Sequence, residues 1–228
     1  CSFVDWILRL IVVKRSHPAE AMAEAIKTGI RMCLESGTAA VGDILSWYDG
    51  RSAFAETPLS GRIFLESLGQ DAALTQQQFN KLSRVLKEQR VGRFEFGLSP
   101  HSPYTIRPQY MTQLFEHALK NQLRTAIHIA ESSAEVDFLD GADGELAEHF
   151  YNAINWHQHR PIAMHLRPIE YLAERGGLYK DQLLVHGVQL NESEIASIAE
   201  AGAQLVLCPR SNARLQVGTA PVAKLKKA

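Results

Sequence analysis

Short apolar runs rich in Val, Ile, Leu and Phe recur along the chain, and each run ends at a polar residue, a glycine or a proline. Runs of this length with such ends indicate buried β-strands. The pattern predicts strands at Ala39–Val41, Ile63–Leu65, Phe94–Leu98, Ala126–Ile127, Leu183–Val185 and Leu205–Leu207.

Between these runs, apolar residues recur at the spacing of helices that bury one face. The long segment Ser132–Lys180 contains several glycines and prolines, so we expect it to hold more than one crossover helix. Strands that mostly alternate with helices predict an α/β fold with a parallel sheet and outer helices. The predicted helices are Pro18–Glu35, Thr75–Gln89, Arg107–Asn121 and Glu192–Ala201.

The composition is that of one globular domain, and it makes nucleic-acid and membrane partners unexpected. The 228 residues are 46% hydrophobic, and 24 Lys and Arg face 25 Asp and Glu, which gives a formal net charge of −1. Such a balance does not attract phosphates, so we expect no nucleic-acid partner. The longest apolar stretch, Trp6–Val13, is interrupted by Arg9 and is far shorter than the roughly 20 residues of a membrane span. We therefore expect no membrane insertion.

The cysteines favour a reducing compartment. Cys1, Cys33 and Cys208 are an odd number, lie far apart and form no C-x-x-C pair. A disulfide scaffold or a thiolate zinc site is not predicted from this spacing. The expected location is the cytoplasm.

Polar side chains close the predicted strands, where the loops of a parallel α/β fold converge. Histidines and carboxylates at neighbouring strand ends suit metal binding and proton transfer. The alternative for each is structural: a buried histidine with a backbone partner, or a carboxylate that faces solvent. The candidates are Asp43, Glu66, His101, His128 with Glu131, His186, and Arg210–Asn212.

Two other sequence features contain side chains that can bind metal or act as nucleophiles, but both are weak candidates for a functional site. His157 and His159 form an H-x-H pair, yet no apolar strand surrounds them and Pro161 follows at once. Cys208 closes a strand without a base beside it in the sequence, so we do not expect a nucleophile there.

Taken together, these motifs resemble the amidohydrolase superfamily in its deaminase and chlorohydrolase branch. The resemblance implies a TIM (β/α)8 barrel, incomplete here, with strands 2–7 present and strands 1 and 8 missing. Residues 1–228 would then be the central part of a metal-dependent hydrolase domain. The matching stretches are Phe3–Ile7, Glu35–Asp43, Gly97–Tyr104, His128–Glu135, Leu184–Gly187 and Leu207–Asn212.

The resemblance also implies roles for individual residues. His128 is the expected metal ligand, and Glu131 is the expected acid and base. His186 is expected to hydrogen-bond the attacking hydroxide or to ligate the metal as well. His101, Glu66 and Arg210 are the expected substrate contacts. One divalent metal is implied, zinc as the first choice and iron as the alternative.

The implied reaction is hydrolytic deamination of a purine-like nucleoside or base, with release of ammonia. Aminodeoxyfutalosine, S-adenosylhomocysteine or methylthioadenosine, and guanine are the substrates that the resemblance suggests, and the stretch Glu131–Glu135 favours the first. A chlorohydrolase, a formimino or guanidino deiminase and a non-catalytic barrel fragment stay open as alternatives. The family takes an H-x-H pair from its first strand and an Asp from its eighth, which these residues lack, so the chain as given is expected to be inactive. Whether the protein forms a homo-oligomer stays open.

Overall fold

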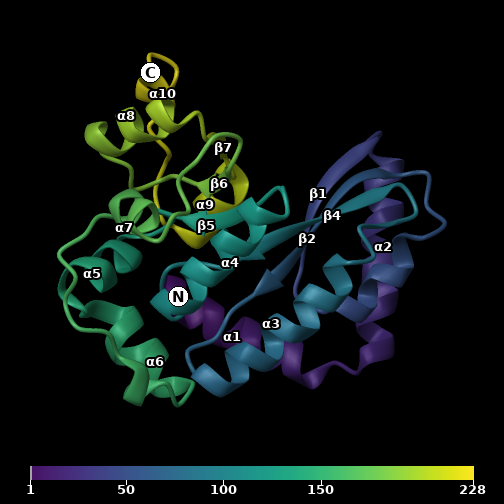
Figure 1. Ribbon diagram of the computed structural model, residues 1–228, viewed down its shortest axis with the longest axis horizontal. Coiled ribbons are helices and arrows are strands. Elements are labelled where there is room, and N and C mark those ends of the chain that lie inside the picture. The colour runs from purple at the N-terminus through teal and green to yellow at the C-terminus, as the bar shows by residue number, and fades with distance from the viewer. Residues whose placement is uncertain (1) are drawn as a thin grey trace.

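Parallel strands form the centre of the computed structural model, which describes residues 2–228 (Figure 1). One sheet has the order β1-β2-β4-β3, and a second has the order β5-β6-β7. All neighbours pair in parallel except β3 and β4, which form an antiparallel pair. The strands are β1 (Ala40–Leu45), β2 (Ser60–Ser67), β3 (Arg90–Val91), β4 (Phe94–Pro100), β5 (Ala126–Ile129), β6 (Leu183–His186) and β7 (Gln204–Val206).

The two sheets meet at β4 and β5. Leu98 and Thr125 form a parallel bridge, and the Leu98 amide donates to the Arg124 carbonyl at 3.0 Å. The parallel strands therefore follow one another in chain order. Within residues 2–228 the array stays open at β1 and β7, so the parallel α/β class is confirmed whereas a closed barrel is not shown.

Each predicted strand overlaps an observed one, but the first ends later than expected. The sequence pattern ended this strand at Gly42–Asp43, whereas β1 continues to Leu45. Asp43 therefore lies inside a strand, where burial raises the pKa of its carboxyl group. The pairing Asp43–Ile63 with β2 extends the strand past the polar residue, which a local pattern does not show.

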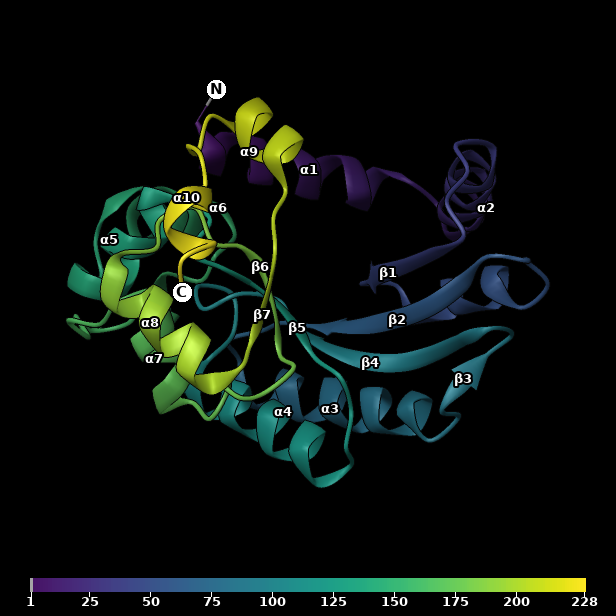
Figure 2. The same cartoon turned by 90° about the horizontal axis from the view of Figure 1, so that it is seen from above.

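Helices cover the strands on more than one side. Figure 2 shows α3 and α4 along one side of β2 and β4, while α1 and α9 lie on the other side of the strands. The α-helices are α1 (Phe3–Ser16), α2 (Ala19–Glu35), α3 (Ala72–Leu86), α4 (Pro108–Lys120), α5 (Ser133–Gly141), α6 (Tyr151–Ala153), α7 (Pro168–Glu174), α8 (Glu192–Ala201), α9 (Pro209–Leu215) and α10 (Val222–Leu225). A π-helical turn covers Leu146–Phe150, and 3-10 turns cover Tyr48–Phe54 and His157–His159.

Capping explains where α3 begins. Asp71 accepts hydrogen bonds from the amides of Ala73 and Leu74, so the helix starts before the predicted Thr75. The predicted α2, α4 and α8 agree with the structure within one residue at each end. α1 and α9 were not predicted as helices.

The core lies between the strands and these helices. Ile63, Leu65 and Leu98 from the strands and Met111 and Leu114 from α4 have no exposed surface. Residues 132–180 hold α5, the π-helical turn, α6 and α7, which confirms that this segment is more than a crossover. Among residues 2–228, no helix is both long and apolar enough to span a membrane.

Candidate active site

Three histidines from three neighbouring strand ends lie together. His101 follows β4, His128 is in β5, and His186 is the last residue of β6. The ring centre of His128 is 5.3 Å from that of His101 and 5.2 Å from that of His186. Nδ1 of His128 is 3.1 Å from Nε2 of His186. The histidines whose convergence the strand pattern predicted are therefore close enough to act on one bound group.

These residues line a cavity of about 320 Å³. One wall comes from α1, which the sequence pattern did not predict as part of the site. Its residues Phe3, Trp6, Ile7, Leu10 and Lys14 line the cavity together with Ile44, Ser46, Glu66, His101, Tyr104, Thr105, His128, Glu131, His186, Ser211 and Leu215.

His186 has an unusual backbone conformation. In the β5–β6 register it pairs with Ile129, so a regular strand would turn its side chain to the same face as Ile129. Its φ of +84° departs from the extended conformation, and Gly187 follows with a φ of +57°. Positive φ at a non-glycine residue costs free energy and gathers at functional sites. The bend lets the imidazole of His186 meet that of His128.

Glu131 and Asn212 approach the other side of His186. Nδ1 of His186 is 3.0 Å from Oδ1 of Asn212 and 3.3 Å from Oε1 of Glu131. Burial raises the pKa of Glu131 to about 7, so this carboxyl can take up or release a proton near neutral pH. Asn212 was expected only as a candidate at the end of a strand, and its position there is the sequence signal that located it.

Glu66 and His101 form the opposite part of the cavity. Nε2 of His101 is 4.0 Å from Oε1 of Glu66, and the other carboxylate oxygen accepts a hydrogen bond from Ser46 at 2.6 Å. Lys14 of α1 in turn donates to Ser46 at 3.1 Å. Nδ1 of His101 contacts the Thr105 hydroxyl at 2.8 Å. Both side chains therefore have fixed orientations.

Burial favours the neutral form of the three histidines in the cavity. It lowers the pKa of His101 and His186, and it lowers that of His128 to well below its usual value. The neighbouring imidazoles His101 and His186 add to this effect at His128. Neutral imidazole is the form that binds metal ions.

The donor atoms present suit a divalent metal. One atom each from Glu66, His101 and His128 lies within 4.8 Å of the others. Nε2 of His186 is 3.1 Å from Nδ1 of His128. Imidazole nitrogens with a carboxylate oxygen are ligands that zinc and iron both accept. The residues therefore fit the implied metal, with His128 at the centre of the donor set.

The remaining sequence candidates lie elsewhere. Arg210 is exposed on α9 and is absent from the residues that line the cavity. His157 and His159 lie in a short 3-10 turn of the 132–180 segment. Burial raises the pKa of the Cys208 thiol, which disfavours the thiolate form that a nucleophile needs.

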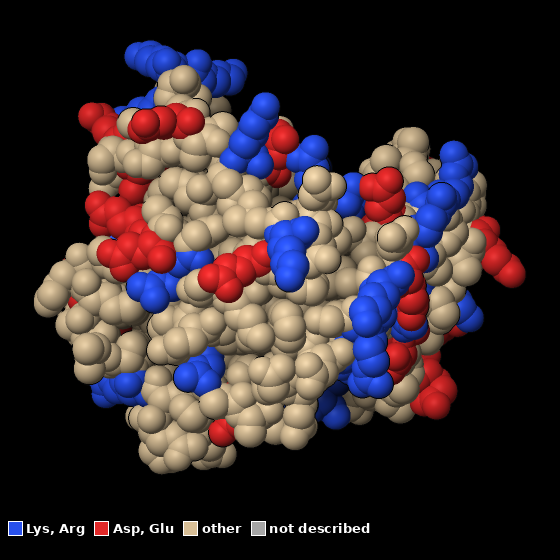
Figure 3. All heavy atoms as spheres, in the orientation of Figure 1, with Lys and Arg blue, Asp and Glu red and all other residues tan. Residues whose placement is uncertain are grey.

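On the face shown in Figure 3, Lys and Arg are interspersed with Asp and Glu, and uncharged residues cover much of the centre.

Comparison with known proteins places the chain in a family. The Amidohydrolase family profile matches residues 1–228, so the chain belongs to this family. It is 31% identical to aminodeoxyfutalosine deaminase of Deinococcus radiodurans over 95% of this chain and 53% of that protein. It is 28% identical to 5-methylthioadenosine/S-adenosylhomocysteine deaminase of Halobacterium salinarum over 92% of this chain and 47% of that protein. The chain thus spans about half the length of the curated relatives it matches.

A solved structure supports the fold. An adenosine deaminase from Xanthomonas campestris with bound zinc superposes with a TM-score of 0.79, at 19% identity, over 100% of this chain and 48% of that one. The family match confirms the resemblance predicted from the motifs. Both curated relatives are named deaminases.

Proposed function

We propose that this chain carries part of the active site of a metal-dependent aminohydrolase, which replaces an amino group on a purine-like nucleoside or base by water and releases ammonia. The observation that carries this proposal is the convergence of His128, Glu131 and His186 on one cavity from two strand ends. The names of the relatives support the same reaction class.

The metal would be a single divalent ion, zinc first and iron as the alternative. His128 is its proposed ligand from this chain, and His186, 3.1 Å away, is either a second ligand or the residue that hydrogen-bonds the attacking oxygen. A divalent ion bound there would lower the pKa of a coordinated water to about 7, so that hydroxide is available at neutral pH. We propose that residues 1–228 are the central part of the domain, in which case the ligands that the family takes from its first and eighth strands would come from residues outside this chain.

Glu131 is the proposed proton carrier. The amino group of the substrate leaves poorly unless it is protonated, so a carboxylate has to accept the proton of the water and pass it to the substrate, from which ammonia then departs. The buried position of Glu131 and its pKa of about 7 suit both steps. His186 hydrogen-bonds the attacking oxygen, and Asn212, 3.0 Å from Nδ1, holds the imidazole in place.

Substrate contacts are proposed at His101, Glu66 and Arg210. The rings of Phe3, Trp6 and Tyr104 in the cavity wall offer flat apolar surfaces for a heterocyclic base. The 31% identity to an aminodeoxyfutalosine deaminase favours that substrate type over methylthioadenosine, S-adenosylhomocysteine or guanine. The substrate contact of Arg210 stays a prediction, because this side chain is exposed and does not line the cavity. The cytoplasmic location also stays a prediction, and whether the protein forms a homo-oligomer stays open.

The test is an assay of the full-length protein, supplied with zinc, for ammonia release from aminodeoxyfutalosine, methylthioadenosine, S-adenosylhomocysteine and guanine. Release that is lost in a Glu131→Gln variant of unchanged metal content supports the proposal. No release from any aminopurine, together with chloride release from a chlorotriazine, would replace it with a chlorohydrolase.

A further inference from the structure

A glutamate at the third position of a helix usually stabilises the N-terminus of that helix. In a capping box, its carboxylate accepts a hydrogen bond from the backbone amide of the N-cap residue. Glu170 does this in α7 by accepting from the Arg167 amide at 2.8 Å. Glu194 does the same in α8 by accepting from the Asn191 amide at 3.0 Å.

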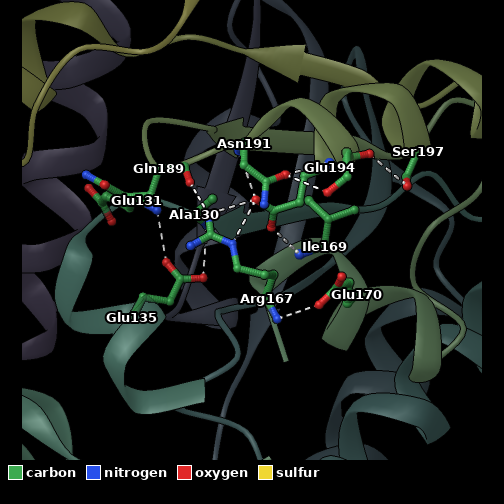
Figure 4. Close-up of polar contacts among 11 residues, drawn as sticks. Ala130, Glu131, Glu135, Arg167, Ile169, Glu170, Gln189, Asn191, Glu194 and Ser197 are labelled. Carbon is green, nitrogen blue, oxygen red and sulfur yellow. Dashed lines mark hydrogen bonds and ion pairs between the residues drawn. The ribbon is translucent and has the colours of Figure 1, made fainter. Parts of the chain in front are cut away.

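Glu135 stands at the same helical position in α5 but binds different amides. Its N-cap residue is Ser132, whose hydroxyl accepts from the Glu135 amide at 3.3 Å. The Glu135 carboxylate does not return to the Ser132 amide. It accepts instead from the amides of Ala130 and Glu131, one on each oxygen and both at 2.9 Å (Figure 4).

Those two amides belong to the segment that carries the proposed proton carrier. Ala130 has a φ of +52°, so the chain turns sharply between His128 and Glu131. The Ala130 carbonyl accepts from the amides of Val188 at 2.8 Å and Gln189 at 2.9 Å, just past His186. The turn is thus held through its amides by Glu135 and through its carbonyl by the chain that follows β6.

The buried position of Glu135 makes its carboxylate unfavourable in free energy, which indicates that the contact has a role. Glu135 has no exposed surface, and burying a carboxylate costs free energy that hydrogen bonds only partly offset. An apolar residue would fill the same place without that cost. A carboxylate with two amide donors instead fixes the direction in which the Glu131 side chain leaves the turn, 3.3 Å from His186.

We propose that Glu135 is a positioning residue, which holds the Ala130–Glu131 turn so that the Glu131 carboxylate meets His186. This inference rests on the proposed function for the role of Glu131, but the contact itself can be tested without turnover. A glutamine at position 135 has one acceptor oxygen, and its amide group would face a backbone N–H. Glu135→Gln therefore loses one of the two hydrogen bonds at nearly unchanged volume.

The matched control is Glu170→Gln, which alters the same helical position away from the Ala130–Glu131 turn. In the full-length protein with zinc, we expect Glu135→Gln to lower kcat about 10- to 100-fold at unchanged KM and metal content. The control variant is expected to lower the thermal midpoint but keep kcat. Equal losses of kcat in both variants would overturn the proposal, since they would show general loosening. So would a Glu135→Gln enzyme with the kcat of the wild type.

Two measurements decide the contact if the wild type releases no ammonia or the variant does not fold. In hydrogen exchange of the wild-type protein, the Ala130 and Glu131 amides should be protected, and exchange as fast as that of exposed amides would refute the contact. In a crystal structure of Glu135→Gln, Glu131 should have moved away from His186. An unmoved Glu131 carboxylate would refute the positioning role even in an inactive protein.

Discussion

Nδ1 of His128 lies 3.1 Å from Nε2 of His186, although 58 residues separate the two in the chain. They meet because β5 and β6 are parallel neighbours whose carboxyl ends share one edge. Burial disfavours the charged form of both rings, so the pair does not repel. The contact gives the site its centre, and the first predictions concern the residues around it.

Asn212→Ala should disturb His186 without removing a proposed metal ligand. The variant loses the 3.0 Å contact that fixes the tautomer and orientation of the imidazole. Partners of this kind typically contribute 10- to 100-fold to activity or metal affinity, so we expect a loss of about that size. Ammonia release and zinc content measure it. Asn121→Ala, which removes a surface cap on α4, is the control and should keep both.

Glu131→Gln should separate substrate binding from chemistry. Glutamine has nearly the same shape but cannot carry a proton, so kcat should fall by about 10²- to 10⁴-fold while KM stays close to the wild-type value. Steady-state kinetics on the full-length protein measure both constants. Wild-type kcat in this variant would rule out Glu131 as the acid and base.

Gly97→Ala should strain the junction of the two sheets. A Cβ atom there would lie 2.7 Å from the Phe64 ring and 2.8 Å from the Arg124 carbonyl oxygen, which accepts the hydrogen bond of Leu98. Overpacking of this kind costs about 1–3 kcal/mol, measurable by denaturant unfolding. Gly29→Ala in α2 has no atom within 4 Å of the new Cβ, so it should stabilise the helix by about 1 kcal/mol. Equal effects of the two substitutions would contradict this account.

His117 should make stability depend on pH in a defined direction. Burial against α3, and secondly Lys120, lower the pKa of this histidine in the folded protein. Above the ordinary histidine pKa of about 6.5 both states are neutral, whereas below it the unfolded chain takes up the proton first. The free energy of unfolding should therefore fall as the pH drops through this region.

The His117→Gln variant isolates this contribution from that of the other buried histidines. Its free energy of unfolding should decrease less than that of the wild type over the same acid range, because glutamine takes up no proton. Urea titrations of both proteins at a series of pH values give the difference. A difference that stays constant with pH would show that His117 contributes no proton linkage.

The sequence by itself determined the order of the six parallel strands and of the helices α2, α3, α4 and α8, and most of the residues at the strand ends. Apolar runs such as Phe94–Leu98 and Leu183–Val185 lie within strands because burial on both faces selects such runs. α8 was predicted at its observed bounds, because Asn191 and Gly202 supply local end signals. His101, His128, Glu131 and His186 were located by the same reasoning, since parallel strands end at one edge.

Only the tertiary structure decided which of these residues touch. The φ of +84° at His186 arises from packing and pairing, and no local pattern predicts it. The sequence pattern showed α1 only as an interrupted apolar stretch, because its role as a cavity wall depends on contacts with residues far along the chain. The local sequence did not predict the hydrogen bonds from the Ala130 and Glu131 amides to Glu135 either, since a glutamate at that helical position predicts a capping box. Local sequence sets which side chains can bind a metal or carry a proton, whereas long-range packing sets their distances.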